Sequence, residues 1–155
     1  MSLVTHLECS FTGKRYEAGK VHGLSEAGKP LLVRYDLEAL AKAVSKRDLL
    51  RRTEGLWRYH EFLPVAKPEN RVSLGEGVTP WIRTPRCERK LGGGEILVKD
   101  EGRLPTGSFK ARGLALAVSM AKEFGLKHLA MPTNGNAGAA MAAYASRAGM
   151  KTTIF

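Results

Sequence analysis

Hydrophobic positions in the second half of the chain form two kinds of run, and the two kinds alternate. Short apolar runs have the length of buried β-strands, and the stretches between them have the apolar spacing of amphipathic helices. The strand-like runs are 96–98, 128–131 and 151–155, and the two helices between them are expected to end near residues 124 and 148. This strand–helix–strand–helix–strand order predicts an α/β fold with a parallel sheet and right-handed crossovers.

The first of these helices carries an apolar stripe whose members recur every three to four positions. The stripe consists of Leu114, Ala117, Val118 and Ala121. We expect this face to be buried, because apolar residues at that spacing share one side of a helix. Gly125 and Gly149 follow the two helices, at positions where glycine commonly ends a helix.

The first half of the chain is less regular. Short strands and turns are expected at its start, where glycines interrupt the apolar positions. A helical part follows, in which Asp36 caps one helix, 55–62 forms a second, and Pro64 and Pro68 mark a linker. The predicted division is 1–35, 36–70 and 71–155.

Two patterns lie between this linker and the alternating region. Residues 79–86 predict a strand with a proline near each end. The glycines at 92–94 could be mistaken for a phosphate-binding loop. They precede a strand, however, and phosphate loops need the positive end of a helix, so we expect a turn there.

Composition restricts the class of protein. The chain has 155 residues, 43% of them hydrophobic, which is enough for one domain with a real core. No apolar run approaches the roughly 18 residues of a membrane span, and no signal-peptide pattern is present at the start. We therefore expect a cytoplasmic protein that has no membrane partner.

The net charge of +10 raises the alternative of a basic, non-enzymatic binding module, for example for nucleic acid. The basic residues are spread along the chain, and the one cluster, 46–52, lies on an amphipathic pattern. We therefore favour solvated basic faces and expect no nucleic-acid partner.

Lys110 is the first candidate for chemistry. It follows an apolar run and a short loop, 105–109, and lies in the first turn of a predicted helix. The helix macrodipole opposes a cation there and so favours the neutral amine, which can attack a carbonyl to form a Schiff base. Ser108 is a candidate N-cap for this helix. The alternative is a surface lysine in solvent.

A second loop, 132–136, also joins a strand-like run to a helix. It is rich in glycine and in side-chain amides, and such loops present hydrogen-bond donors to an anion at the positive end of a helix. Both loops are expected at the carboxyl edge of one parallel sheet, where ligands of open α/β folds bind.

Together these motifs resemble a known family. The sequence Gly-Ser-Phe-Lys at 107–110, followed by Thr-Asn-Gly-Asn at 133–136, is similar to the fold-type II pyridoxal phosphate enzymes of the tryptophan synthase β-like superfamily. Residues 73–80 and 98–110 resemble threonine synthase most closely. The resemblance implies a three-layer fold around a parallel sheet.

It also implies roles for individual residues. Lys110 would hold pyridoxal 5'-phosphate as a Schiff base and act as general base at the α-carbon of an amino-acid substrate. Ser108 and Asn136 would bind the cofactor, with the Asn136 amide at the ring hydroxyl. The substrate carboxylate would bind to a loop made of Thr133, Asn134, Gly135 and Ala137. From the residues alone, Thr133 is equally a side-chain turn and Asn136 a helix N-cap.

The implied reaction converts O-phospho-L-homoserine and water into L-threonine and phosphate. Threonine synthases commonly have an acidic residue directly after the Schiff-base lysine, whereas this chain has Ala111. Lys-Ala-Arg-Gly, as found at 110–113, occurs in amino-acid dehydratases of the same superfamily, so a threonine or serine dehydratase remains open. Arg112 is expected to form a structural ion pair.

The start of the chain resembles the zinc-ribbon-like leader of many threonine synthases. Four ligands are needed for a tetrahedral site, and here Cys9 is left with Thr12 at its partner position. We expect a metal-free remnant held by Leu7, Phe11, Tyr16, Leu31 and Val33. Cys87 lies far from Cys9 in sequence and suggests no disulfide.

The chain is shorter than the resembled enzymes. We therefore expect a fragment that is inactive alone, because the family's glycine-rich phosphate loop and the hydroxyl residue facing the pyridine nitrogen are not found in it. A homodimer is expected for the full-length protein.

Overall fold

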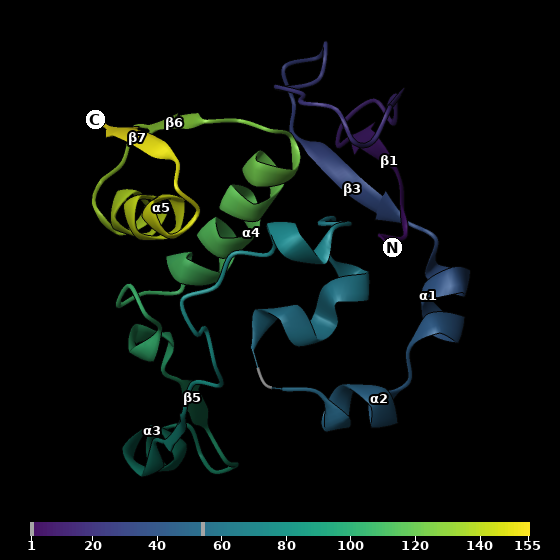
Figure 1. Cartoon of the computed structure of the whole chain (residues 1–155). Helices are drawn as coiled ribbons and strands as arrows, with labels where there is room; N and C mark the ends of the chain where they lie inside the picture. Colours follow the sequence, from purple (N-terminus) through teal and green to yellow (C-terminus); the bar gives the residue numbers. More distant parts are fainter. Residues whose placement is uncertain (1, 54) are drawn as a thin grey trace.

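The computed structural model describes residues 2–53 and 55–155 and shows an α/β chain with three small sheets in that part (Figure 1). The strands are β1 (Val4–Cys9), β2 (Arg15–Tyr16), β3 (Leu31–Tyr35), β4 (Trp81–Arg83), β5 (Leu97–Lys99), β6 (His128–Met131) and β7 (Lys151–Ile154). The α-helices are α1 (Leu37–Ala43), α2 (Lys46–Arg51), α3 (Pro85–Lys90), α4 (Lys110–Glu123) and α5 (Asn136–Arg147). Short 3₁₀ helices cover Leu56–Phe62 (η1), Pro68–Asn70 (η2) and Glu101–Arg103 (η3). Among these helices none has both the length and the apolar character that a bilayer crossing requires.

The N-terminal strands form an antiparallel sheet in the order β2-β1-β3. Phe11 and Val33 were expected to help hold it, but they are 77% and 39% exposed, so the prediction is wrong for these two residues. The chain then runs through α1, which Asp36 caps as predicted: its Oδ1 accepts from the amide of Ala39 at 2.9 Å.

Helix α2 was not predicted, although its signal is in the sequence. Ser45 and Asp48 form a capping box, in which each side chain accepts from the other residue's amide. The expected short helix at 55–62 is present as η1. Its Trp57 donates from Nε1 to the carbonyl of Val72 at 3.1 Å, which joins the helical part to the α/β part.

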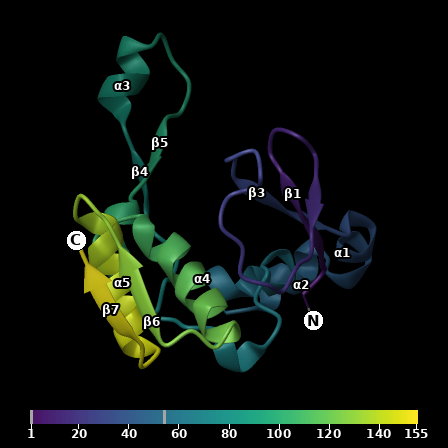
Figure 2. The ribbon, with the colours of Figure 1, turned by 90° about the horizontal axis from the view of Figure 1, so that it is seen from above.

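Strands β4 and β5 correct the sheet prediction. Run 96–98 was expected in a parallel sheet with the two later strands, but β5 pairs antiparallel with β4. The two strands and α3 form an arm that extends away from α4 and α5 (Figure 2). All three residues of each strand are exposed, so neither strand has a buried apolar face that would favour pairing with the β6–β7 sheet. The prediction of a strand over 79–86 missed α3, whose start Pro85 marks as a favoured first helical residue.

The remaining strands form the expected parallel pair. β6 and β7 are in register from His128 with Lys151 to Met131 with Ile154, and α5 connects them. Both helices end as predicted, with Gly125 at φ 72° and Gly149 at φ 70°. The turn at 92–94 is also confirmed.

The core lies between α4, α5 and neighbouring loops. Its buried members are Val72, Leu104, Ala111, Leu114, Ala115, Val118, Ala140, Met141, Tyr144 and Ala145. Ala117, expected in the buried stripe, is exposed, and Ala115 takes its place. Alanines on both helices permit a close approach, and Tyr144 is the largest side chain that the approach encloses.

Gly138 is predicted to be required for packing α5 against the β6–β7 sheet. An added Cβ would lie 2.4 Å from Cγ2 of Thr133 and 2.9 Å from Cγ2 of Ile154. Gly138→Ala should therefore lower the free energy of unfolding by about 1–3 kcal/mol. The matched control is Gly113→Ala in α4, where an added Cβ meets nothing within 4 Å. That change should raise stability by about 0.5–1 kcal/mol. Urea unfolding measures both, and equal effects would contradict the packing argument.

Candidate active site

Lys110 is the first residue of α4 and is partly buried. Its Nζ lies 4.5 Å from the centroid of the Phe109 ring, a cation–π distance. No ion pair engages this amine within residues 2–53 and 55–155. Chemistry at this lysine requires an amine that is not held in a permanent salt bridge, and no such bridge holds it among the described residues.

Ser108 does not cap α4, contrary to the prediction. The cap position belongs to Phe109, which makes no side-chain capping bond. The Ser108 hydroxyl is instead buried, as is that of Thr106, and neither has a hydrogen-bond partner in the described part of the chain. Buried hydroxyls are normally paired. Two unpaired ones within four residues of Lys110 fit a site that is completed by a polar ligand.

The second loop is organised by Thr133. Its Oγ1 accepts from the amides of Gly135 at 3.1 Å and Gly138 at 3.0 Å, so it forms a side-chain turn and satisfies a free amide at the start of α5. Asn136 was predicted as a possible N-cap, but it is the first helical residue and the cap position is Gly135. Neither observation tests the roles in cofactor or substrate binding, which stay predictions.

The remaining loop residues lie at the surface. Asn134, Gly135 and Asn136 are exposed and Ala137 is partly buried. Gly135 has φ 130°, a conformation that side-chain-bearing residues rarely adopt. The loop therefore presents two amide side chains and the positive end of a twelve-residue helix to solvent.

The two predicted loops belong to helices that pack against each other. They do not touch through polar contacts: no hydrogen bond in the described part of the chain joins Lys110 to residues 133–137. Since β5 is not in the β6–β7 sheet, the expectation that both loops extend from one sheet edge is wrong. What connects the two helices is the hydrophobic core between them.

A polar network beside Lys110 was not predicted as a whole. Glu101 accepts from Arg112 through Nε at 2.6 Å and Nη2 at 2.9 Å, and from the Thr79 hydroxyl at 2.5 Å. Lys99 donates to both Glu101 and Thr79. The Arg112 hydrogen bonds, supported by those from Lys99 and Thr79, hold the pKa of the Glu101 carboxyl well below its usual range. The expectation that Arg112 forms a structural ion pair is confirmed.

This network joins three segments. Arg112 also donates to the carbonyl of Gly77 at 3.4 Å, so α4, η3 and the loop 73–80 are tied at one place. In that loop Glu76 is buried, and its carboxylate accepts from the Ser73 hydroxyl at 2.8 Å and the Leu74 amide at 2.7 Å. Burial, with Glu76 nearby, raises the pKa of the Tyr144 hydroxyl. A signal for this network was available in the Glu-Gly pairs of 73–80 and 98–104.

The only buried cysteine of the described residues lies in the N-terminal sheet. The Cys9 thiol is 3.1 Å from the hydroxyl of Ser25 and accepts from the Thr12 amide at 3.4 Å. These hydrogen bonds, Ser25 first, lower the pKa of Cys9 to about 6. No group of three or more histidine, cysteine or acidic residues that could hold a metal is found outside positions 1 and 54. The zinc-ribbon ancestry of this sheet stays a prediction.

Comparison with known proteins defines the class of the chain. Residues 72–155, more than half of it, match the family model for pyridoxal-phosphate dependent enzymes. The chain therefore belongs to this family, as the motifs around Lys110 predicted.

The individual relatives that the chain resembles include threonine synthases. The chain is 40% identical over 146 residues to a threonine synthase of Methanocaldococcus jannaschii, a match covering 94% of this chain and 36% of the relative. A threonine synthase of Methanosarcina acetivorans is 34% identical over 150 residues, covering 96% and 36%. One of Halalkalibacterium halodurans is 43% identical over 99 residues, covering 64% and 28%. The chain thus spans about a third of the length of the curated relatives that it matches.

The Glu101 network is predicted to make stability depend on pH. The pKa of this carboxyl lies below the unfolded value of about 4.3, so its contribution is present at neutral pH and is lost as pH falls through about 4 and below. Glu101→Gln should lower the free energy of unfolding by about 1–3 kcal/mol at pH ~7 and by less at pH ~3. Urea unfolding at both pH values tests this.

Glu17→Gln is the control, because Glu17 pairs with Lys20 at the surface, at 2.6 Å. It should change stability by less than about 0.5 kcal/mol. An equal loss for Glu101→Gln at both pH values would contradict the assigned role of its charge.

Proposed function

We propose that the chain is the lysine-bearing part of a threonine synthase, which converts O-phospho-L-homoserine and water into L-threonine and phosphate. The observation that carries this proposal is the 40% identity over 94% of the chain to a relative named threonine synthase. The Lys110 amine, which has no ion pair in the described part of the chain, and the two hydroxyls beside it that have no hydrogen-bond partner there support the proposal.

Pyridoxal 5'-phosphate would supply an electron sink for the carbanion character that develops at the α-carbon of the substrate. Lys110 would hold the cofactor covalently through Nζ and would then take the proton from the α-carbon as general base. Ser108 would offer its hydroxyl to the cofactor, and the Asn136 amide would hydrogen-bond the ring hydroxyl.

The loop at the start of α5 would bind the substrate carboxylate. Thr133, Asn134, Gly135 and Ala137 stand at the positive end of the helix, which favours an anion. Thr133 Oγ1 already accepts two amide hydrogen bonds, and its hydroxyl proton would be donated to the substrate carboxylate. The partner is thus a small amino-acid substrate.

We further propose that the chain does not turn over substrate alone, because it spans about a third of its relatives' length. The full-length protein would be a cytoplasmic homodimer without nucleic-acid partners.

A threonine or serine dehydratase is the second candidate. It is favoured by Ala111, which follows Lys110 where threonine synthases commonly have an acidic residue. The two candidates differ in product, since one releases phosphate and the other a 2-oxoacid.

Lys110→Ala is predicted to abolish covalent capture of the cofactor at this site. After incubation of the chain with pyridoxal 5'-phosphate and reduction with borohydride, the wild-type peptide carrying Lys110 should gain the mass of the reduced adduct. Peptide mass spectrometry measures it. The control is Lys42→Ala on the exposed end of α1, which should leave capture at Lys110 unchanged. Adducts spread evenly over surface lysines, without preference for Lys110, would contradict the assignment.

A chimera is predicted to separate the two reactions. This chain would replace the matching 146 residues of the Methanocaldococcus jannaschii relative. The chimera should release phosphate from O-phospho-L-homoserine, and Lys110→Ala in it should reduce that rate by at least about a thousandfold. Release of a 2-oxoacid from threonine or serine, with no phosphate release, would support the dehydratase instead.

A further inference from the structure

Arg58 lines two cavities. One, of about 670 Å³, is formed by residues from 51–60 and 73–77, and the other, of about 350 Å³, adds Lys99, Glu101 and Arg112. Gly55, Leu56, Arg58 and Gly77 line both. We call the two together the Arg58 cleft. Neither cavity is lined by Lys110 or by residues 133–137, so the cleft is separate from the proposed cofactor and substrate loops.

The guanidinium of Arg58 is partly buried without a carboxylate partner. Nη2 donates to the carbonyl of Leu49 at 2.5 Å, and Cζ lies 5.4 Å from the centroid of the Tyr59 ring. These contacts fix the side chain but leave its charge uncompensated. Nε is buried and has no acceptor in the described part of the chain, and no acidic residue there pairs with this arginine. Charged groups that are fully removed from water are normally paired, and Nε is the atom of Arg58 to which this applies.

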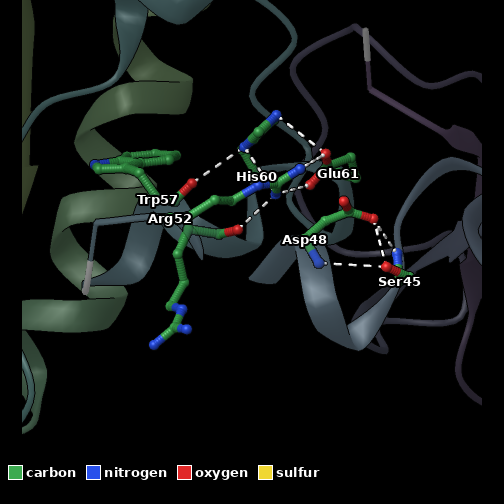
Figure 3. Close-up of polar contacts among 7 residues, drawn as sticks. Ser45, Asp48, Arg52, Trp57, His60 and Glu61 are labelled. Atoms are coloured by element: carbon green, nitrogen blue, oxygen red, sulfur yellow. Dashed lines mark hydrogen bonds and ion pairs between the residues drawn. The ribbon is translucent and has the colours of Figure 1, made fainter. Parts of the chain in front are cut away.

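The other charged groups of the cleft are largely neutralised. Arg52 is bound at 2.5 and 2.7 Å by both oxygens of Glu61, which His60 also approaches (Figure 3). On the other side, Lys99 and Arg112 share Glu101. The carboxylate of Glu76 is occupied by its own loop.

Arg51 and Arg58 are therefore the lining cations that have no carboxylate partner in the described part of the chain, while Lys99 and Arg112, which share one carboxylate, add a further net positive charge. Arg51 and Arg58 are on the same wall, which runs from the end of α2 into η1. These guanidiniums would attract an anion in the cleft, and the Glu76 carboxylate that lines the same cavity already accepts two hydrogen bonds from its own loop.

The walls are held in place before any ligand arrives. The Arg52–Glu61 pair joins the end of α2 to η1. Across the cleft, a Cβ added at Gly55 would lie 2.7 Å from the carbonyl oxygen of Glu76, so the two segments are in close contact there. Arg112 ties Gly77 to α4. A cleft with fixed walls loses little conformational freedom when it binds a ligand.

We propose that the Arg58 cleft binds the phosphate group of a small molecule. A guanidinium matches the oxygens of phosphate with two parallel donors, and it holds its charge at every physiological pH. The cavity volumes fit a small ligand rather than a polymer. The site is additional to the proposed active site and does not depend on the activity of Lys110.

Titration of the ¹⁵N-labelled chain with inorganic phosphate tests the proposal, with NaCl at matched ionic strength as the reference. The arginine Nε–H signals of Arg58 and Arg51 should shift and saturate with phosphate, while that of Arg15, on β2 away from the cleft, should not. Equal, unsaturated shifts of all arginines would mean only general screening and would overturn the proposal.

Substitutions of Arg58 test whether this side chain binds the phosphate. Arg58→Gln should weaken phosphate binding about tenfold or more, and Arg58→Lys should retain part of it. Arg47→Gln on α2, which lines neither cavity, and Lys110→Ala should bind phosphate as the wild type does. The amide signal of Tyr144 reports the folded core in each variant. Undiminished binding by folded Arg58→Gln would overturn the proposal, and loss of binding in Lys110→Ala would place phosphate at the proposed active site instead.

Discussion

The hydrogen-bonded charge cluster around Glu101 is the interaction on which the arrangement of this region depends. One carboxylate, about a quarter exposed, receives donors from α4, from the strand before it and from Thr79. A carboxylate that accepts hydrogen bonds from several charged donors is held in place better than one in an exposed surface pair. The donors replace the water that its oxygens lose on burial. The consequence is that the loop before Lys110 and the loop at 73–80 cannot move independently. The position of Lys110 at the start of α4 is therefore tied to that of loop 73–80.

Loop 73–80 in the same region has two structural roles. Loop 73–80 buries Glu76 against Ser73 and Leu74 and also forms a wall of the Arg58 cleft. The carbonyl of Glu76 lies where a side chain at Gly55 would be, and the carbonyl of Gly77 accepts a hydrogen bond from Arg112. A glycine-rich loop can be well ordered and still leave a cavity beside it, since its backbone supplies hydrogen-bond partners while its glycines add no side-chain volume.

The β6–β7 sheet and the β4–β5 arm differ in how they are covered. A parallel pair with one connecting helix is the smallest unit of an α/β sheet, and β6, α5 and β7 form it here. The β4–β5 arm leaves Trp81, Ile82, Leu97 and Val98 between 45% and 60% exposed. Exposed apolar side chains on two short strands contribute little to stability until another element covers them. The α4–α5 core, in contrast, is closed by alanines and Tyr144 and contains no residue of the arm.

What the sequence determined by itself is local. The helix ends at Gly125 and Gly149, the cap at Asp36, the existence of strands β6 and β7 and the family motifs around Lys110 all follow from patterns a few residues long. The tertiary structure alone decided which hydroxyls are buried at Thr106 and Ser108, that Thr133 rather than Asn136 satisfies the start of α5, and that β5 leaves the parallel sheet. Capping and turn preferences act between neighbours in sequence. Strand pairing, and the burial of a charge such as Arg58, depend instead on segments that meet only after folding, and no short window of sequence contains them.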